Sequence, residues 1–187
     1  MKLLVLLENT FNDIELTTTL SIFKASNKFD EITFYSSYAN KSVGQFNITT
    51  VDSIINEVNV NDYDAIFIPG GSGCQTLRTN KDNLNTIKQF IDAQKRVFAI
   101  CDAPNVLAET KILPDVKYSS YPSEWSILTR TEKRTDNDVT VDQQFITARN
   151  AVSAEQFGFT ILKELFGKDH ANAVYQAISG NIDKTIF

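Results

Sequence analysis

The sequence predicts an α/β fold with a mostly parallel, doubly wound β-sheet, formed by a single domain that spans residues 1–187. Short, continuous apolar runs alternate with amphipathic stretches over the first 110 residues, as in a parallel sheet covered by helices on both faces. A chain of 187 residues also has the length of one domain, and it can bury a sizeable core without a disulfide or a metal. Finally, no internal repeat, low-complexity tract or linker rich in Pro, Gly or Ser divides the chain.

Four apolar runs have the length and the β-branched or aromatic content of strands that are buried on both faces. These strands are expected at Leu3–Leu7, Ile32–Tyr35, Ala65–Ile68 and Val97–Ile100. Helical patterns lie between the strands, at about Asp13–Asn27 and Asn83–Gln94. The short alternating stretch Gly44–Val51 predicts an edge ribbon.

The last third of the chain has a different pattern. Residues Glu124–Ile146 have the pattern of short antiparallel segments, and the polar stretch Thr135–Asp138 is expected to form a turn between two of them. A long helix is predicted at Ala151–Phe166. Gly167 would end this helix, and Asp169 would cap the next one.

Composition excludes several classes of protein. Eighteen basic and 23 acidic residues give a net charge of −5, which argues against a general nucleic-acid binder but not against a small anionic or neutral substrate. Two cysteines and one histidine are too few for a Cys/His zinc site or a disulfide scaffold, so we expect no metal, no cofactor and a reducing, cytoplasmic location. The opening apolar run ends at Glu8, too soon for a signal peptide or a membrane span.

The most informative segment is Arg96–Pro104, in which a predicted strand ends at Cys101 and helix-forming residues follow at once. This is the layout of a nucleophile elbow, with Cys in place of Ser, and Ala99 and Ala103 supply the room that such a tight turn needs. A thiol at a helix N-terminus is favoured as the thiolate. The alternative is a plain buried cysteine at the end of a strand.

Two further segments are expected to reach the same edge of the sheet. The glycine-rich residues Gly70 and Gly71 follow the third core strand, where their backbone N–H groups and that of Asp102 could form an oxyanion hole. The loop fits neither GxGxxG nor a phosphate-binding P-loop, and it could also be a turn that binds nothing. Glu15 lies at the first strand–helix junction, where it could approach Cys101 or simply be a solvated residue of the first helical turn.

Together these segments resemble the ThiJ/PfpI superfamily (the DJ-one/PfpI family), which includes the Parkinson-associated deglycases. The resemblance rests on Glu15, on Pro69–Gly71, on Ala99–Pro104 and on Thr147–Asn150, in this order along the chain. It implies a flavodoxin-like three-layer α/β/α sandwich that forms a homodimer.

The resemblance also implies roles for single residues. Cys101 would be the nucleophile and a redox-sensitive thiol, and a protonated Glu15 would hydrogen-bond the sulfur, stabilise its thiolate and move protons. The amides of Gly71 and Asp102 would receive the developing oxyanion.

The chain departs from the family at the histidine positions. Asp102 stands where peptidase-like members carry His, and Tyr121 is the nearest match to the His of deglycase-like members; it could donate a hydrogen bond or simply pack beside Pro122. The only histidine, His170, is expected to have a capping or surface role. Cys74 could be a resolving thiol, although the sequence does not show its distance from Cys101. Trp125 and Tyr118 are candidates for the pocket wall or for the core.

These observations favour a cysteine-dependent enzyme of the glyoxalase or deglycase type, acting on a small reactive carbonyl such as methylglyoxal. Two alternatives stay open. One is a non-enzymatic oxidative-stress sensor or chaperone, in which Cys101 is oxidised. The other is a hydrolase of small amides or peptides, which the missing histidine disfavours.

Overall fold

The computed structural model describes residues 1–187 and is built around a seven-stranded sheet. Its five principal strands, all parallel, are β1 (Lys2–Leu6), β2 (Glu31–Tyr35), β6 (Ala65–Ile68), β7 (Arg96–Ile100) and β11 (Phe145–Ala148). Their order in the sheet is β2-β1-β6-β7-β11, the 2-1-3-4-5 order of flavodoxin-like folds. Two edge strands complete the sheet: β5 (Ile54–Ile55) pairs with β2, and β10 (Val139–Asp142) pairs antiparallel to β11. The predicted doubly wound fold is confirmed.

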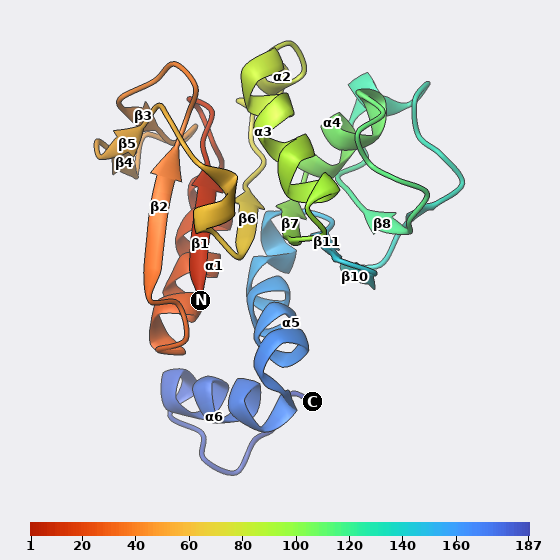
Figure 1. Ribbon diagram of the computed structural model, residues 1–187. Helices are drawn as coiled ribbons and strands as arrows, with labels where there is room; N and C mark the ends of the chain where they lie inside the picture. Colours follow the sequence, from red (N-terminus) through yellow and green to blue (C-terminus); the bar gives the residue numbers. More distant parts are fainter.

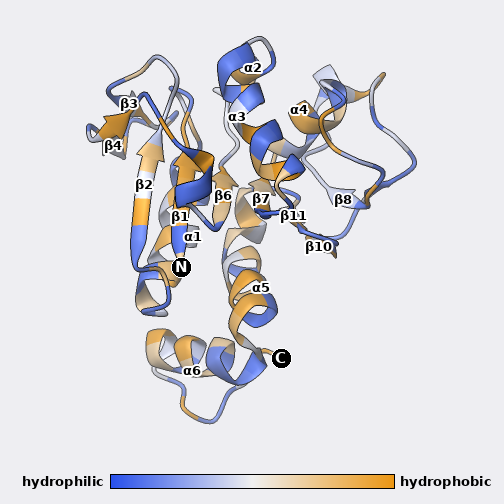
Figure 2. Ribbon diagram, in the orientation of Figure 1, coloured by the Kyte–Doolittle hydropathy of each residue, from blue (hydrophilic) through white to orange (hydrophobic).

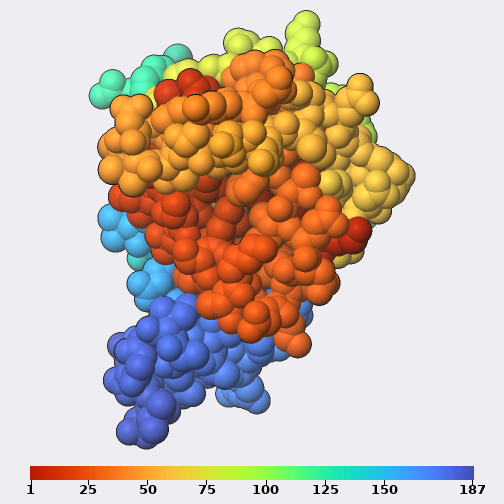
Figure 3. All heavy atoms as spheres, turned by 90° about the vertical axis from the view of Figure 1, so that its left-hand side faces the viewer, coloured from red at the N-terminus to blue at the C-terminus, as the bar shows by residue number.

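Helices cover both faces of the sheet, as Figure 1 shows. One face carries α1 (Asp13–Ala25) and α5 (Ala154–Phe166), and α6 (Lys168–Ser179) packs on α5. The other face carries α2 (Cys74–Leu77), α3 (Lys81–Asp92) and α4 (Ala103–Glu109). Helix α6 and the C-terminus lie at the opposite end of the molecule from the carboxyl ends of the strands (Figure 1). They form a separate projection in the space-filling view of Figure 3.

The alternation of side chains along the strands builds two hydrophobic cores. In β1 and the residue that follows it, Leu3, Val5 and Leu7 pack under α1 and α5, whereas Leu4 and Leu6 pack under α3 and α4. All five side chains are at most 1 % exposed, and β1 is mostly orange, that is hydrophobic, beyond its first residue in Figure 2. Strand β2 is an exception to the prediction: four of its five residues are only half-buried, because its outer neighbour β5 has just two residues.

The predicted elements of the first half lie within about two residues of the observed ones. The expected ribbon at Gly44–Val51 is a hairpin of β3 (Ser42–Val43) and β4 (Thr50–Val51), but it forms a sheet of its own instead of an edge of the main sheet. The short helix α2 was not predicted, because four residues carry no periodic pattern. No helix is long and apolar enough to cross a membrane.

The prediction for Glu124–Ile146 was largely wrong. Residues Glu124–Ser126 form a 3-10 turn, and β9 (Arg134–Thr135) pairs parallel with β8 (Tyr118–Ser119) rather than antiparallel with β10. The antiparallel pair in this region is β10–β11, and its turn is at Gln143 and Gln144. Gln143 has a φ of 52°, a left-handed conformation that the sequence did not signal.

The C-terminal helices agree better with the prediction. Residues Ala151–Ser153 form a 3-10 turn that leads directly into α5, and Gly167 ends α5 with a φ of 88°. Asp169 does not cap α6: Gly167 occupies the N-cap position, and Asp169 lies inside the first turn, where its negative charge complements the helix dipole.

Candidate active site

A pocket of about 490 Å³ opens at the carboxyl edge of the sheet, where the strand order reverses between β1 and β6. It is the only cavity in the molecule that a cysteine lines. Its lining residues are Asn12, Glu15, Gln45, Gly71, Ser72, Cys101, Asp102, Tyr121, Trp125, Asn150, Ala151 and Val152. Glu15, Gly71 and Cys101, which the sequence singled out in three separate segments, therefore line the same pocket.

Cys101 sits in the tight turn between β7 and α4. Its φ is 65°, a left-handed conformation that costs a non-glycine residue free energy and is held here by the surrounding structure. The Cys101 N–H donates to the Ala148 carbonyl at 2.9 Å, which ties the turn to the end of β11. Gly70 packs against the other side: a Cβ atom at this position would lie 2.6 Å from the Cys101 Cβ. The turn has the geometry expected of a nucleophile elbow, and Cys101 is a partly exposed residue that lines the pocket.

Glu15 is completely buried beneath the thiol. Asn12 caps α1, and its Oδ1 accepts from the N–H groups of Ile14 and Glu15 at 3.0 and 3.3 Å, so the first turn of the helix holds the carboxyl in place. The Gly70 N–H donates to Glu15 Oε2 at 2.7 Å. Burial raises the pKa of Glu15 to about 7, against the contacts with Cys101 and the Gly70 N–H, which lower it. Glu15 can therefore both accept and donate a proton near neutral pH.

The thiol does not have the lowered pKa that a helix N-terminus was expected to produce. Burial, the charge and hydrogen bonding of Glu15, and the charge of Asp102 raise the pKa of Cys101, and the Gly71 N–H only partly opposes them. In the absence of substrate, the Cys101 sulfur therefore keeps its proton next to Glu15. A proton acceptor, rather than a preformed thiolate, has to activate Cys101, and Glu15 is the acceptor in contact with it.

Two backbone N–H groups are available beside the sulfur. The Gly71 N–H faces Cys101, and the Asp102 N–H has no acceptor within the protein. Gly71 adopts a φ of 100° and has backbone atoms of Phe11 and Asn12 within 2.7 Å of the place where a Cβ would be, so no other residue fits without a shift. These donors have the arrangement expected of an oxyanion hole.

Three side-chain amides on the pocket wall were not predicted. The oxygens of Asn12, Gln45 and Asn150 each accept a backbone N–H, from Glu15, Ser72 and Ser153 respectively. None of their NH₂ groups donates to a protein group, and all three residues line the pocket. With its oxygen engaged, each amide can present only its donor side, so the wall suits a ligand that carries hydrogen-bond acceptors.

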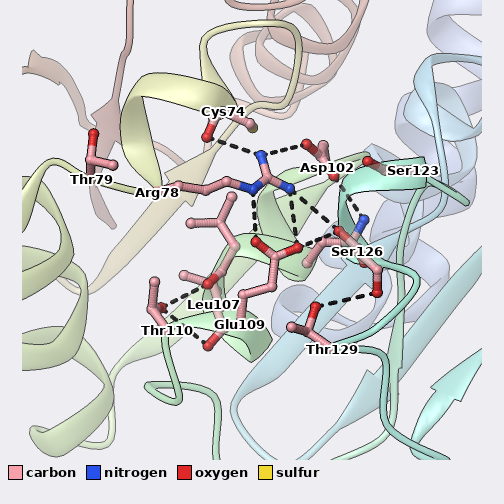
Figure 4. Close-up of polar contacts among 12 residues, drawn as sticks. Cys74, Arg78, Thr79, Asp102, Leu107, Glu109, Thr110, Ser123, Ser126 and Thr129 are labelled. Carbon is pink, nitrogen blue, oxygen red and sulfur yellow. Dashed lines mark hydrogen bonds and ion pairs between the residues drawn. The ribbon is translucent and has the colours of Figure 1, made fainter.

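Asp102 is tied into an ion pair behind the thiol. Arg78 Nη1 donates to its Oδ2 at 2.8 Å, and Asn105 Nδ2 donates to its Oδ1 at 2.8 Å. Figure 4 shows Arg78 between Asp102 and Glu109. Both oxygens of Asp102 are thus engaged away from the sulfur, and Asp102 does not replace the histidine of peptidase-like proteins.

The remaining candidates divide between pocket and core. Tyr121 and Trp125 line the pocket and are 46 % and 68 % exposed. Tyr118 and Cys74, at 1 % and 2 % exposed, are buried in the core and do not line the pocket, so Cys74 does not reach the pocket in which a resolving thiol would have to act. Burial raises the pKa of the Cys74 thiol.

His170 lies in α6, where its ring meets the edge of Phe166 with 5.9 Å between the ring centroids. It does not line the pocket, which therefore contains no histidine. No group of three or more His, Cys, Asp or Glu side chains is placed so that it could hold a metal ion.

Comparisons with known proteins give matches over most of the chain. The DJ-1/PfpI family model matches residues 1–164. The chain is 36 % identical to the uncharacterized protein MG029 of Mycoplasma genitalium over 172 residues, 90 % of each chain. It is 29 % identical to the glutathione-independent glyoxalase DJ-1 of Schizosaccharomyces pombe over 144 residues, 76 % of this chain and 72 % of that one.

It is also 27 % identical to protein/nucleic acid deglycase 2 of Escherichia coli over 170 residues, 88 % of this chain and 97 % of that one. Among solved structures, the VC2308 protein superposes with a TM-score of 0.84 at 18 % identity, covering 95 % of this chain and 92 % of that one. That last likeness shows the shared fold. From the family match and these relatives we conclude that the chain belongs to the DJ-1/PfpI family.

Proposed function

We propose that this protein converts a small reactive carbonyl compound, such as methylglyoxal, into the corresponding hydroxy acid through Cys101. One observation carries the proposal: Cys101 shares a pocket with a carboxyl group of pKa about 7 and with the backbone N–H groups of Gly71 and Asp102. A nucleophile, a group that moves protons near neutral pH and an oxyanion site are what addition to an aldehyde requires.

The proposed reaction begins with addition of the thiol. Cys101 Sγ bonds to the aldehyde carbon, the thiol proton passes to the Glu15 carboxylate, and the N–H groups of Gly71 and Asp102 receive the oxyanion. Glu15 then protonates that oxygen to give a hemithioacetal. Because the thiol is protonated at rest, the proton acceptor has to be in contact with it, as Glu15 is.

The hemithioacetal then isomerises by proton transfer. Glu15 moves the proton from the former aldehyde carbon to the neighbouring ketone carbon, and the proton of the hemithioacetal hydroxyl passes to the former ketone oxygen. These two transfers leave a lactoyl thioester on Cys101. Water cleaves the thioester, releasing lactate and restoring the thiol. One water is consumed, and the sequence needs no external oxidant or reductant.

Names within the family support a carbonyl substrate. Two of the relatives are named a glyoxalase and a deglycase, and both names denote action on carbonyl compounds or their adducts. The amide NH₂ groups of Asn12, Gln45 and Asn150 would hydrogen-bond the oxygens of such a substrate, and the exposed ring of Trp125 would cover its apolar part.

The two alternatives have less support. Cysteine hydrolases pair the nucleophile with a histidine that protonates the amine leaving group, and this pocket contains no histidine. An oxidative-stress sensor would need a thiol that is readily oxidised, which follows thiolate character, whereas burial raises the pKa of Cys101. The sensor remains the second candidate because Cys101 is partly exposed and lines the pocket.

A homodimer is part of the proposal. The proposed contact surface is the exposed apolar side chains of Ile14, Phe46 and Ile48, which are 48 %, 54 % and 80 % exposed and are near the pocket residue Gln45 in the sequence or through the Asp13 contacts. The buried Asp13 carboxylate holds this surface together by accepting from the N–H groups of Phe46 and Thr49. The β3–β4 hairpin, which carries Phe46 and Ile48, lies in the orange band of Figure 3.

The proposed location is the cytoplasm, because the two free thiols suit a reducing compartment.

Lactate formation from methylglyoxal tests the function. We expect Cys101→Ser to abolish it and Glu15→Gln to reduce kcat/KM by about 10²- to 10⁴-fold, since a general acid–base group is lost. Cys74→Ser is the matched control and should keep the activity, because Cys74 lies outside the pocket.

Absence of Cys101-dependent lactate would contradict the enzymatic proposal. If peroxide treatment then added two oxygen atoms to Cys101 alone, measured by peptide mass spectrometry, the sensor would be supported. Release of ammonia from small amides in the absence of lactate would point to the hydrolase.

A further inference from the structure

Arg78, which follows α2, joins the carboxylates of Asp102 and Glu109 (Figure 4), and Asp102 is the residue next to the candidate nucleophile. Its Nη1 donates to Asp102 Oδ2 at 2.8 Å, and its Nε and Nη2 donate to the two oxygens of Glu109 at 2.7 and 3.2 Å. The side chains of Arg78, Asp102 and Glu109 are 15 %, 7 % and 13 % exposed. Hydrogen bonds from Arg78 to Asp102 and Glu109 raise the pKa of the guanidinium, so its charge is permanent.

The same cluster reaches the segment that covers the pocket. The Ser126 hydroxyl donates to Glu109 Oε1, and Arg78 Nη2 lies 3.4 Å from that hydroxyl. Asn105, which holds the other oxygen of Asp102, also donates to the Tyr121 carbonyl at 2.8 Å. Residues 121–126 carry the pocket residues Tyr121 and Trp125, so one buried cluster contacts both the elbow and the cover of the pocket.

Charge explains why the thiol site needs such a cluster. Asp102 is the residue next to Cys101 and is 5 % exposed, so an unpaired carboxylate there would oppose any negative charge on sulfur or on the substrate oxygen. The charged or titratable groups of the thiol site and of the cluster beside it come from four segments. They are Glu15 from α1, Cys74 in α2 with Arg78 at its end, Asp102 just before α4 with Glu109 as its last residue, and Tyr121 from the covering segment. Arg78 is the only cation among them.

We propose that Arg78 is a positioning residue for the thiol site: it neutralises and fixes the carboxylate beside Cys101, and through Glu109 and Ser126 it fixes the segment that carries Tyr121 and Trp125. Lysine could not do the same, because a single ammonium cannot donate to Asp102 and to both oxygens of Glu109 in these directions. The proposal rests on Cys101 as the reacting group of the proposed function.

The test is the rate of Cys101 alkylation by iodoacetamide between pH 6 and 10, which needs no substrate, measured in a Cys74→Ser background. We expect Arg78→Gln to slow alkylation at pH 8 by about tenfold, the effect of a one-unit rise in thiol pKa. Asp102→Asn in the Arg78→Gln background should restore most of the rate, whereas Asp102→Asn alone should speed alkylation by a smaller factor, because Arg78 already offsets part of the Asp102 charge. This non-additivity is the signature of Arg78 acting through Asp102.

Matched variants separate this effect from simple loss of folding. Arg96→Gln makes the same change of charge at the other end of β7 and should leave the alkylation profile unchanged. Arg78→Lys keeps the charge and should show an intermediate profile; circular dichroism would show whether each variant is folded. An alkylation profile of folded Arg78→Gln or Arg78→Lys equal to that of the parent protein would overturn the proposal.

The single tryptophan gives a second readout. Trp125 is the only tryptophan in the chain, so its fluorescence anisotropy reports on the covering segment alone. We expect Arg78→Gln and Ser126→Ala to lower the anisotropy, and unchanged anisotropy in both would overturn the part of the proposal that concerns the segment. If alkylation responds as expected but methylglyoxal is not converted, the proposed function fails while the role of Arg78 stands.

Discussion

At the scale of single residues, the site depends on how closely Gly70 packs against the thiol. A Cβ at Gly70 would lie 2.6 Å from the Cys101 Cβ and 2.8 Å from both Glu15 Oε2 and the Ile100 carbonyl oxygen. These distances are shorter than any relaxed contact, and one of the neighbours is backbone that cannot rotate away. The absence of a side chain at Gly70 is therefore what lets the Glu15 carboxyl and the Cys101 thiol meet.

We predict that Gly70→Ala reduces lactate formation by more than tenfold and lowers the free energy of unfolding by about 1–3 kcal/mol, the usual range for overpacking. Activity and denaturant unfolding measured on the same sample would check this. Gly180→Ala is the control: nothing lies within 4 Å of the added Cβ, so it should lose only about 1 kcal/mol from its left-handed φ and keep its activity. Full activity in Gly70→Ala would show that the close packing is not required.

At the scale of elements, α1 carries Glu15 to the thiol, and its first turn is held by Asn12. The Asn12 side chain has two separate roles that different substitutions can resolve, because its oxygen caps the helix whereas its NH₂ group faces the pocket. A serine can replace the cap but not the NH₂ group.

We expect Asn12→Ala to cost about 1 kcal/mol of stability through loss of the cap, together with a lower kcat because Glu15 is less well held. Asn12→Ser should keep the stability and kcat but raise KM, if the amide binds the substrate. Asn80→Ala removes the cap of α3, outside the pocket, and should lower stability without changing either kinetic constant. Identical kinetics for Asn12→Ala and the parent protein would contradict both roles.

At the scale of the whole molecule, burial of Glu15 makes stability depend on pH. The folded-state pKa of about 7 lies above the ordinary value of 4.5, so the folded protein binds the proton more tightly than the unfolded chain does. Stability from this group is fully present below about pH 4.5 and is lost as pH rises through 7. Burial also raises the pKa of Glu8, which acts in the same direction.

We predict that Glu15→Gln flattens this dependence. The parent protein should lose about 3 kcal/mol between pH 4.5 and 8 from Glu15, and the variant should lose only what other groups such as Glu8 contribute. Urea unfolding at a series of pH values would measure the difference. A Glu15→Gln variant with the same slope as the parent protein would show that Glu15 is not buried in its charged form above pH 7.

The local features of this protein could be read from short stretches of sequence. The apolar runs predicted the buried strands, and the alternation of these runs with helical patterns predicted the parallel sheet. Both patterns are local, because they reflect which side chains along a single strand or helix are buried. The elbow at Cys101, the glycines at 70–71 and Glu15 could likewise be recognised, since the 2-1-3-4-5 order brings the carboxyl ends of β1, β6 and β7 together.

What required the tertiary structure was every contact made across loops. The amides of Gln45 and Asn150, the burial of Cys74 and the pairing of β8 with β9 depend on where loops lie, and no local pattern specifies that. The pKa of the Cys101 thiol also depended on contacts that the sequence does not specify. The helix N-terminus predicted a lowered pKa, but burial and the carboxyl groups of Glu15 and Asp102 raise it. The partner of Asp102 is Arg78, 24 residues away in the chain, and only folding brings the two charges to 2.8 Å.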